Sequence, residues 1–177
     1  MTENYSSIRL QGETHIEVHH FHSGAVVFAA ITALVVQALL PVYIPAAAIL
    51  DLPLLVTLYF GLSRRNPSTG LLLGTGMGLL QDSLSKTPIG LYGIAKTLVG
   101  FLASSIGGRI DTEHPVSRFA LTVFFFGLHQ GTIVLIKRLL LAQPEAWFSV
   151  QFAIAAGVNG VASVGLFFLM DRLRKSA

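Results

Sequence analysis

The chain has 177 residues, enough for one domain, of which 53% are hydrophobic and only 12% are charged. Because soluble domains carry roughly 25% charged residues and this chain has a mean hydropathy of +0.67, the composition excludes an ordinary water-soluble fold and indicates a membrane protein. A net charge of +3 at a pI of about 9.5 fits basic cytoplasmic loops better than a nucleic-acid-binding surface.

Residues 1–23 form a polar N-terminal segment, which we expect to be cytoplasmic. Within it THIEVHHF alternates Ile16 and Val18 with polar neighbours, which predicts a short strand, with disorder as the alternative. A cleavable signal is not expected, because one arginine and three glutamates precede the first apolar run. Four histidines are expected at the surface or at lipid headgroups rather than on a metal ion: His15, His19, His20 and His22.

Six apolar stretches follow, and each is expected to cross the membrane as a helix of about 20 residues or slightly fewer. They cover residues 24–41, 46–63, 68–80 (to 84 if the helix continues), 89–106, 119–135 or beyond, and 146–170. Pro41 and Pro45 are expected to end the first helix. The predicted fold is therefore an all-α membrane protein, with a six-helix transmembrane domain over residues 24–171 and a basic cytoplasmic tail over residues 172–177.

The distribution of lysine and arginine predicts the orientation. With six spans and a cytoplasmic N-terminus, eight basic residues fall inside and three fall outside, as the positive-inside rule requires. The inner residues are Arg9, Arg64, Arg65, Arg109, Arg118, Arg172, Arg174 and Lys175, and the outer ones are Lys86, Lys137 and Arg138. We therefore expect a multi-pass protein of the bacterial inner membrane, in contact with lipid and with both termini in the cytoplasm.

Small residues recur every four positions along the third, fifth and sixth predicted helices. Because helices in lipid associate through close packing rather than the hydrophobic effect, these faces are expected to pack inside the bundle, with a partner's helix as the alternative. The glycines concerned are Gly70, Gly74, Gly78, Gly127, Gly131, Gly157 and Gly160.

Four polar residues are expected to form a cluster in the outer half of the bundle: Asp51, Gln81, Asp82 and Lys96. Lys96 lies about 10 Å along the fourth helix from its outer end, at 1.5 Å per residue. Because an unpaired ammonium is unfavourable in hydrocarbon, Lys96 is expected to pair with an aspartate, unless it extends outward to water. Asp82 is the preferred partner because the third and fourth helices are adjacent along the chain, and Asp51 is the alternative.

The remaining intramembrane polar groups, His129, Gln130 and Asn159, are expected to form hydrogen bonds between helices. An ion relay is not expected, because the inner half supplies no carboxylate. The chain has no cysteine and none of the motifs GxSxG, HExxH, Walker A or GxGxxG. We therefore predict neither an enzyme nor a bound metal or cofactor.

Two stretches resemble the core of the MreD family, the rod shape-determining membrane proteins of bacteria: DLPLLVTLYFGLSRR (51–65) and TGLLLGTGMGLLQDSLSKTPIGLYGIAKTLVGFLASSIGGRI (69–110). The shared features are an aspartate that opens the second helix, a basic turn, a glycine-rich third helix ending in Gln-Asp, and Pro-Ile-Gly-Leu before the fourth helix. Lys96 departs from the pattern, because that position is more often apolar or small in the family.

The resemblance implies a non-catalytic scaffold or regulator of the bacterial cell-elongation (rod) complex. Such proteins act with the bitopic protein MreC and, indirectly, with the actin-like MreB and the glycosyltransferase–transpeptidase pair that builds lateral peptidoglycan. Their six-helix fold is similar to the S components of energy-coupling-factor vitamin transporters. A vitamin-binding S component is therefore the alternative function, with Ala29 and Ala33 as a helix-contact face and Tyr92 and Asp82 as lining of an outer cavity.

Overall fold

The computed structural model describes residues 23–85, 87–110, 112, 114–143, 146 and 149–172. In these ranges the chain is helical and contains no strand; the strand and the histidines predicted near the N-terminus lie outside them. The elements are α1 (Ser23–Tyr43), the short 3-10 helix η1 (Pro45–Ile49), α2 (Leu52–Arg64), α3 (Pro67–Ser85), α4 (Leu91–Ile106), α5 (Pro115–Leu140) and α6 (Val150–Asp171).

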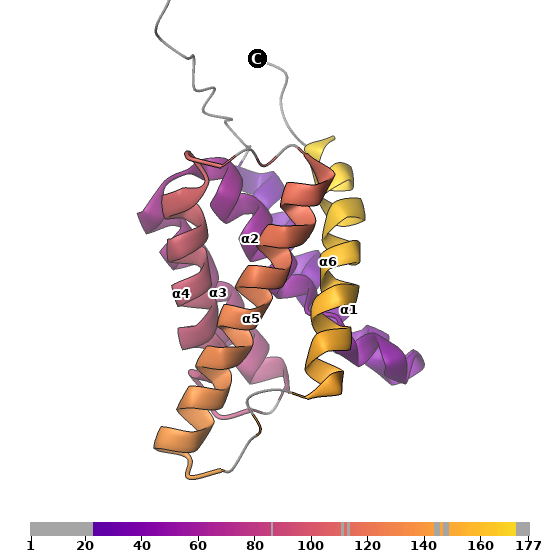
Figure 1. Cartoon of the computed structure of the whole chain (residues 1–177), viewed down its shortest axis with the longest axis vertical. Helices are drawn as coiled ribbons and strands as arrows, with labels where there is room; N and C mark the ends of the chain where they lie inside the picture. The colour runs from indigo at the N-terminus through magenta and orange to yellow at the C-terminus, as the bar shows by residue number, and fades with distance from the viewer. Residues whose placement is uncertain are drawn as a thin grey trace, which may run out of the picture.

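The helices form a bundle in which α1 begins and α6 ends at the same end, the top of Figure 1. The central helix is α2, which contacts α1, α3, α4, α5 and α6. Every residue from Pro53 to Ser63 in α2 is buried. At 13 residues it is about 20 Å long, shorter than the roughly 30 Å hydrocarbon core of a bilayer. Because other helices enclose it, its length need not match the bilayer.

The second predicted span, residues 46–63, is wrong as a single helix. The chain breaks between η1 and α2, and Asp51 becomes the N-cap of α2, its side chain accepting a hydrogen bond from the backbone N–H of Leu54. Pro53 follows in the first turn, where a missing N–H leaves no helical bond unmade. In contrast, Pro41 does not end α1, which continues to Tyr43.

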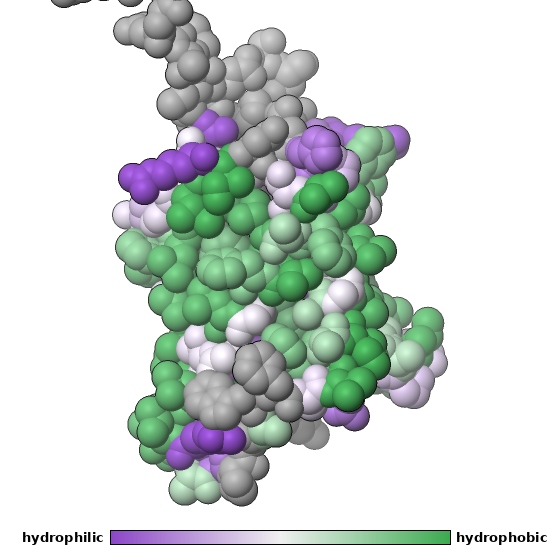
Figure 2. All heavy atoms as spheres, viewed as in Figure 1, coloured by the Kyte–Doolittle hydropathy of each residue, from purple (hydrophilic) through white to green (hydrophobic). Residues whose placement is uncertain are grey.

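The surface has the polarity of a membrane protein. Hydrophobic residues form a broad band around the middle of the face in Figure 2, with hydrophilic residues toward its upper and lower ends. Three helices are long and apolar enough to cross a membrane: Gly24–Tyr43, Pro115–Leu140 and Val150–Asp171. By the same measures α2 and α4 are apolar but shorter. Large side chains such as Phe28 and Leu72, which are 71% and 70% exposed, face outward, as expected where lipid is the solvent.

The glycines of α3 bring its backbone against α4. A Cβ atom at Gly70 would collide with Ser104 and the backbone of Gly100, and one at Gly74 would collide with the backbone of Lys96. Gly78 meets α4 one turn further along in the same way. Only glycine permits so close an approach of two helices, which in lipid takes the place of hydrophobic driving force.

The glycines of α5 and α6 behave differently. Gly160 is packed under the ring of Phe119, and Gly127 makes only an ordinary contact with the helix opposite. At Gly131 and Gly157 no described atom lies within 4 Å of the position that a Cβ would take. At these two positions the structure does not show the expected close packing between helices.

Candidate functional site: a buried ion pair beside a polar cavity

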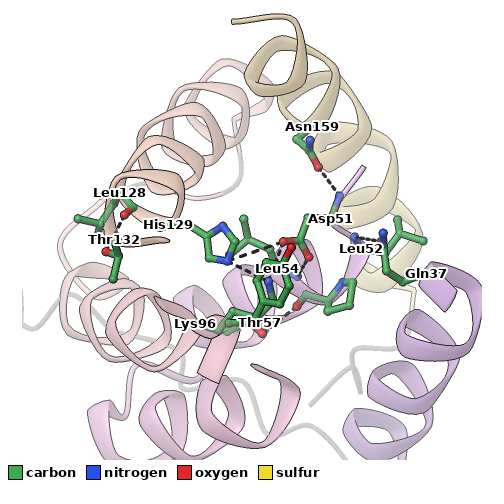
Figure 3. A network of polar contacts seen from close by, with 12 residues as sticks. Gln37, Asp51, Leu52, Leu54, Thr57, Lys96, Leu128, His129, Thr132 and Asn159 are labelled. Atoms are coloured by element: carbon green, nitrogen blue, oxygen red, sulfur yellow. Dashed lines mark hydrogen bonds and ion pairs between the residues drawn. The ribbon is translucent and has the colours of Figure 1, made fainter. Parts of the chain in front are cut away.

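The centre of the site is an ion pair between Lys96 of α4 and Asp51 at the start of α2. Lys96 Nζ lies 2.7 Å from Asp51 Oδ2, and the lysine side chain is fully buried (Figure 3). Of the two partners considered for Lys96, the structure brings it to Asp51, and the preference for Asp82 was wrong. The reason is that α2 packs against α4 in the middle of the bundle, which places the cap of α2 beside the lysine.

Asp82 has another role, at the start of α4. Its carboxylate accepts hydrogen bonds from the backbone N–H groups of Gly90, Tyr92 and Gly93 and from the hydroxyl of Thr87, at 2.8–3.1 Å. The first N–H groups of a helix have no partner within the helix, and the N-cap residue here is Gly90, which has no side chain. Asp82 therefore caps α4 from the end of α3, where its negative charge also complements the helix dipole.

His129 of α5 lies next to both members of the ion pair. Its Nε2 lies 3.1 Å from Lys96 Nζ and 3.8 Å from Asp51 Oδ2 (Figure 3). Because a lysine ammonium only donates hydrogen bonds, Nε2 must accept one, and the ring proton is then assigned to Nδ1. Tyr92 stacks on the imidazole at 5.9 Å between ring centroids, and its own ring lies 5.1 Å from Lys96 Nζ.

Two amide side chains hold the chain break between η1 and α2. Asn159 of α6 accepts from the backbone N–H of Asp51 and donates to the carbonyl of Ile49, each at 2.9 Å. Gln37 of α1 donates to the carbonyl of Leu50 and accepts from the N–H of the residue after Asp51 (Figure 3). These bonds satisfy the backbone groups that a break inside an apolar bundle would leave unpaired. Gln37 was missed from the sequence, where an amide inside an apolar first helix was the available signal.

A cavity of about 680 Å³ lies beside the ion pair, between α5, α6 and η1. Asp51, His129, Gln130 and Gln81 line it, together with Tyr92. Gln81 therefore faces the same space as Asp51 without bonding to the ion pair, whereas Asp82 lies outside this lining. Two buried polar atoms have no hydrogen-bond partner here: Oε1 of Gln81 and Nδ1 of His129. Among the described residues, no group of three or more His, Asp or Glu side chains is placed to hold a metal ion.

A second polar network, which was not predicted from the sequence, lies at the opposite end of the bundle. Arg118 of α5 forms a salt bridge of 2.7 Å with Asp171 at the end of α6 and donates to the carbonyl of Thr112. The hydroxyl of Tyr59 on α2 donates to the same aspartate at 2.9 Å. The two networks therefore connect α2 to α4 through Asp51 and to α6 through Tyr59.

An all-helical bundle with an apolar belt, long apolar helices and its buried charges paired inside is the architecture of a helical membrane protein. The family model of the rod shape-determining protein MreD matches residues 20–176, and the chain therefore belongs to the MreD family. No curated protein and no solved structure matches the chain significantly.

Proposed function

We propose that this protein is a non-catalytic scaffold or regulator of the bacterial rod complex, which binds MreC and helps control cell shape and lateral peptidoglycan synthesis. The observation that carries the proposal is the family match, which extends over residues 20–176. The family is described by its role in rod shape rather than by a reaction. MreC as direct partner, and MreB and the glycosyltransferase–transpeptidase pair as indirect ones, follow from the resemblance of the sequence to that family.

The proposal includes six membrane-crossing helices with both termini in the cytoplasm. The described basic residues support this orientation, because their distribution follows the positive-inside rule. Arg64 and Arg65 end α2, Arg118 lies at the start of α5, and Arg172 follows α6, all at the end of the bundle where α1 begins. The last turn of α5, at the other end, carries Lys137 and Arg138.

Depletion of the protein in its own bacterium, combined with affinity purification, tests the proposal. We expect rod cells to widen and round on depletion, a wild-type copy to restore the rods, and a tagged copy to recover MreC from solubilised membranes. A tagged, unrelated polytopic membrane protein serves as the purification control. Cells that stay rod-shaped after full depletion, with no MreC recovered above the control, would contradict the proposal.

One observation favours the second candidate, a vitamin-binding S component. Such a protein needs polar and aromatic groups that converge on a cavity, and Tyr92 lines the cavity of about 680 Å³ beside the ion pair. Asp82, the other residue expected to line it, caps α4 instead. The likeness to S components stays a prediction. Recovery of an ATPase pair in place of MreC in the same purification would favour this candidate.

A further inference from the structure

The cavity between α5 and α6 has the size of a small-molecule site. Its volume of about 680 Å³ falls within the roughly 300–1,000 Å³ typical of ligand pockets. Phe126 of α5 and Phe152 and Ala155 of α6 give it an apolar wall, and Gln81 and His129 give it polar groups. An apolar wall facing a few polar groups is the usual composition of a site for a small organic ligand.

Two of the polar groups have unused hydrogen-bonding capacity. Oε1 of Gln81 and Nδ1 of His129 are buried and have no partner, although more than nine in ten buried polar groups in proteins have one. Lys96 donates to the other ring nitrogen of His129, so Nδ1 carries the proton and is a donor. Figure 3 shows this nitrogen on the side of the ring away from the ion pair. The cavity therefore presents one donor and one acceptor.

The charges around the cavity favour a neutral ligand. Asp51 is the only carboxylate among the described lining residues, and Lys96 neutralises it at 2.7 Å. Lys96 itself is fully buried and does not reach the cavity surface. An ionic ligand would lose hydration on entering the cavity and would find no free counter-charge among the described lining residues, which is unfavourable.

We infer that this cavity binds a neutral amphiphile that carries an amide group. The amide N–H donates to Gln81 Oε1, the amide carbonyl accepts from His129 Nδ1–H, and the hydrocarbon part packs against Phe126 and Phe152. An amide is a compact neutral group that supplies both a donor and an acceptor. The test of this site is independent of the proposed role in the rod complex, because ligand binding is measured on the purified protein alone.

Photoaffinity labelling of the full-length protein tests the site. The protein is placed in phosphatidylcholine nanodiscs, whose lipid has no amide, and labelled with a nonanamide analogue that carries a diazirine and an alkyne on its chain. We expect saturable labelling, mapped to peptides of α5 and α6, which unlabelled nonanamide displaces. Nonanoate, nonylammonium and nonane, which have the same chain length, should not displace it at equal concentration.

Two variants with matched controls connect the labelling to the cavity. Gln81→Leu removes the acceptor and should weaken binding about tenfold, the size of one hydrogen bond; Gln143→Leu, at an exposed site, should not. Ala155→Phe fills the cavity and should abolish labelling, whereas Ala153→Phe, exposed on the same helix, should not.

A stability measurement separates a binding role from a structural one. Because Gln81 Oε1 has no partner in the unliganded protein, Gln81→Leu should leave its thermal stability unchanged or raise it. If Ala155→Phe does not fold, the comparison of Gln81→Leu with Gln143→Leu decides alone. Non-saturable labelling, equal displacement by nonane, or undiminished labelling of Gln81→Leu would show that the cavity holds only water or bulk lipid and would overturn the inference.

Discussion

The ion pair between Lys96 and Asp51 makes a quantitative prediction about stability. Asp51→Asn keeps a good N-cap for α2 but leaves the Lys96 ammonium, which is 0% exposed, without its counter-ion. Removing one partner of a buried pair typically destabilises a protein by about 3–5 kcal/mol, and we expect the free energy of unfolding to fall by that amount.

The reverse substitution should be milder. Lys96→Met leaves the Asp51 carboxylate, whose side chain is 12% exposed, at the wall of the cavity, where water can hydrate it. It also keeps the hydrogen bond from the N–H of Leu54. We therefore expect a loss of about 1–3 kcal/mol, below the usual range for breaking a buried pair.

The double variant decides between pairing and mere packing. Replacing both partners of a buried pair by uncharged residues is often nearly neutral, so the double variant should lie within about 1 kcal/mol of the wild type. Reversible unfolding in mixed micelles gives the free energies for the double-mutant cycle. Arg109→Met, which removes an exposed charge, is the control and should change stability by less than about 0.5 kcal/mol. Additive single effects, or an Asp51→Asn loss no larger than that of Lys96→Met, would refute the reasoning.

Three further predictions use the same measurements or simple reporters. Gly74→Leu should lower thermal stability in detergent because it separates α3 from α4, whereas Gly131→Leu, which faces open space, should not; equal losses would contradict the packing. Asp82→Ala should cost about 2 kcal/mol or more, because buried N–H groups of α4 lose their acceptor; an unchanged unfolding midpoint would show that water replaces the carboxylate. Reporter fusions should read external in the loops before α4 and before α6 and internal before α5, and any reversal would refute the topology. The fusion points are Lys86, Glu145 and Asp111.

Hydropathy located α1, α5 and α6 well because these helices are long apolar runs, which are stable in lipid wherever they lie in the chain. It failed at the second span because residues 46–50 are as apolar as α2 itself. The break there depends on Gln37 and Asn159, which supply hydrogen bonds from helices distant in the sequence. Only Asp51 and Pro53, a cap followed by a proline, indicated where α2 begins.

The buried pair was predicted in kind but not in its partner. Proximity along the chain favoured Asp82 for Lys96, because α3 and α4 are adjacent. However, the N-cap of α4 is Gly90, which has no capping side chain, and the carboxylate of Asp82 accepts the N–H groups there instead. A cavity lined by Tyr92 was expected from the alternative function, but its lining by Gln81 and His129 was not. That lining depends on how α5 and α6 are spaced, which no local sequence pattern encodes.

The break between η1 and α2 has a consequence for membrane insertion. Asn159, on the last helix, supplies partners for the N–H of Asp51 and the carbonyl of Ile49, and unpaired backbone groups in hydrocarbon are unfavourable by several kcal/mol each. The ribosome adds Asn159 108 residues after Asp51. The backbone groups at the break between η1 and α2 therefore lack these partners during most of the synthesis of the chain. The early helices must keep this region hydrated or shielded by the insertion machinery until α6 arrives. The final helix therefore sets the moment at which the protein becomes a stable membrane bundle.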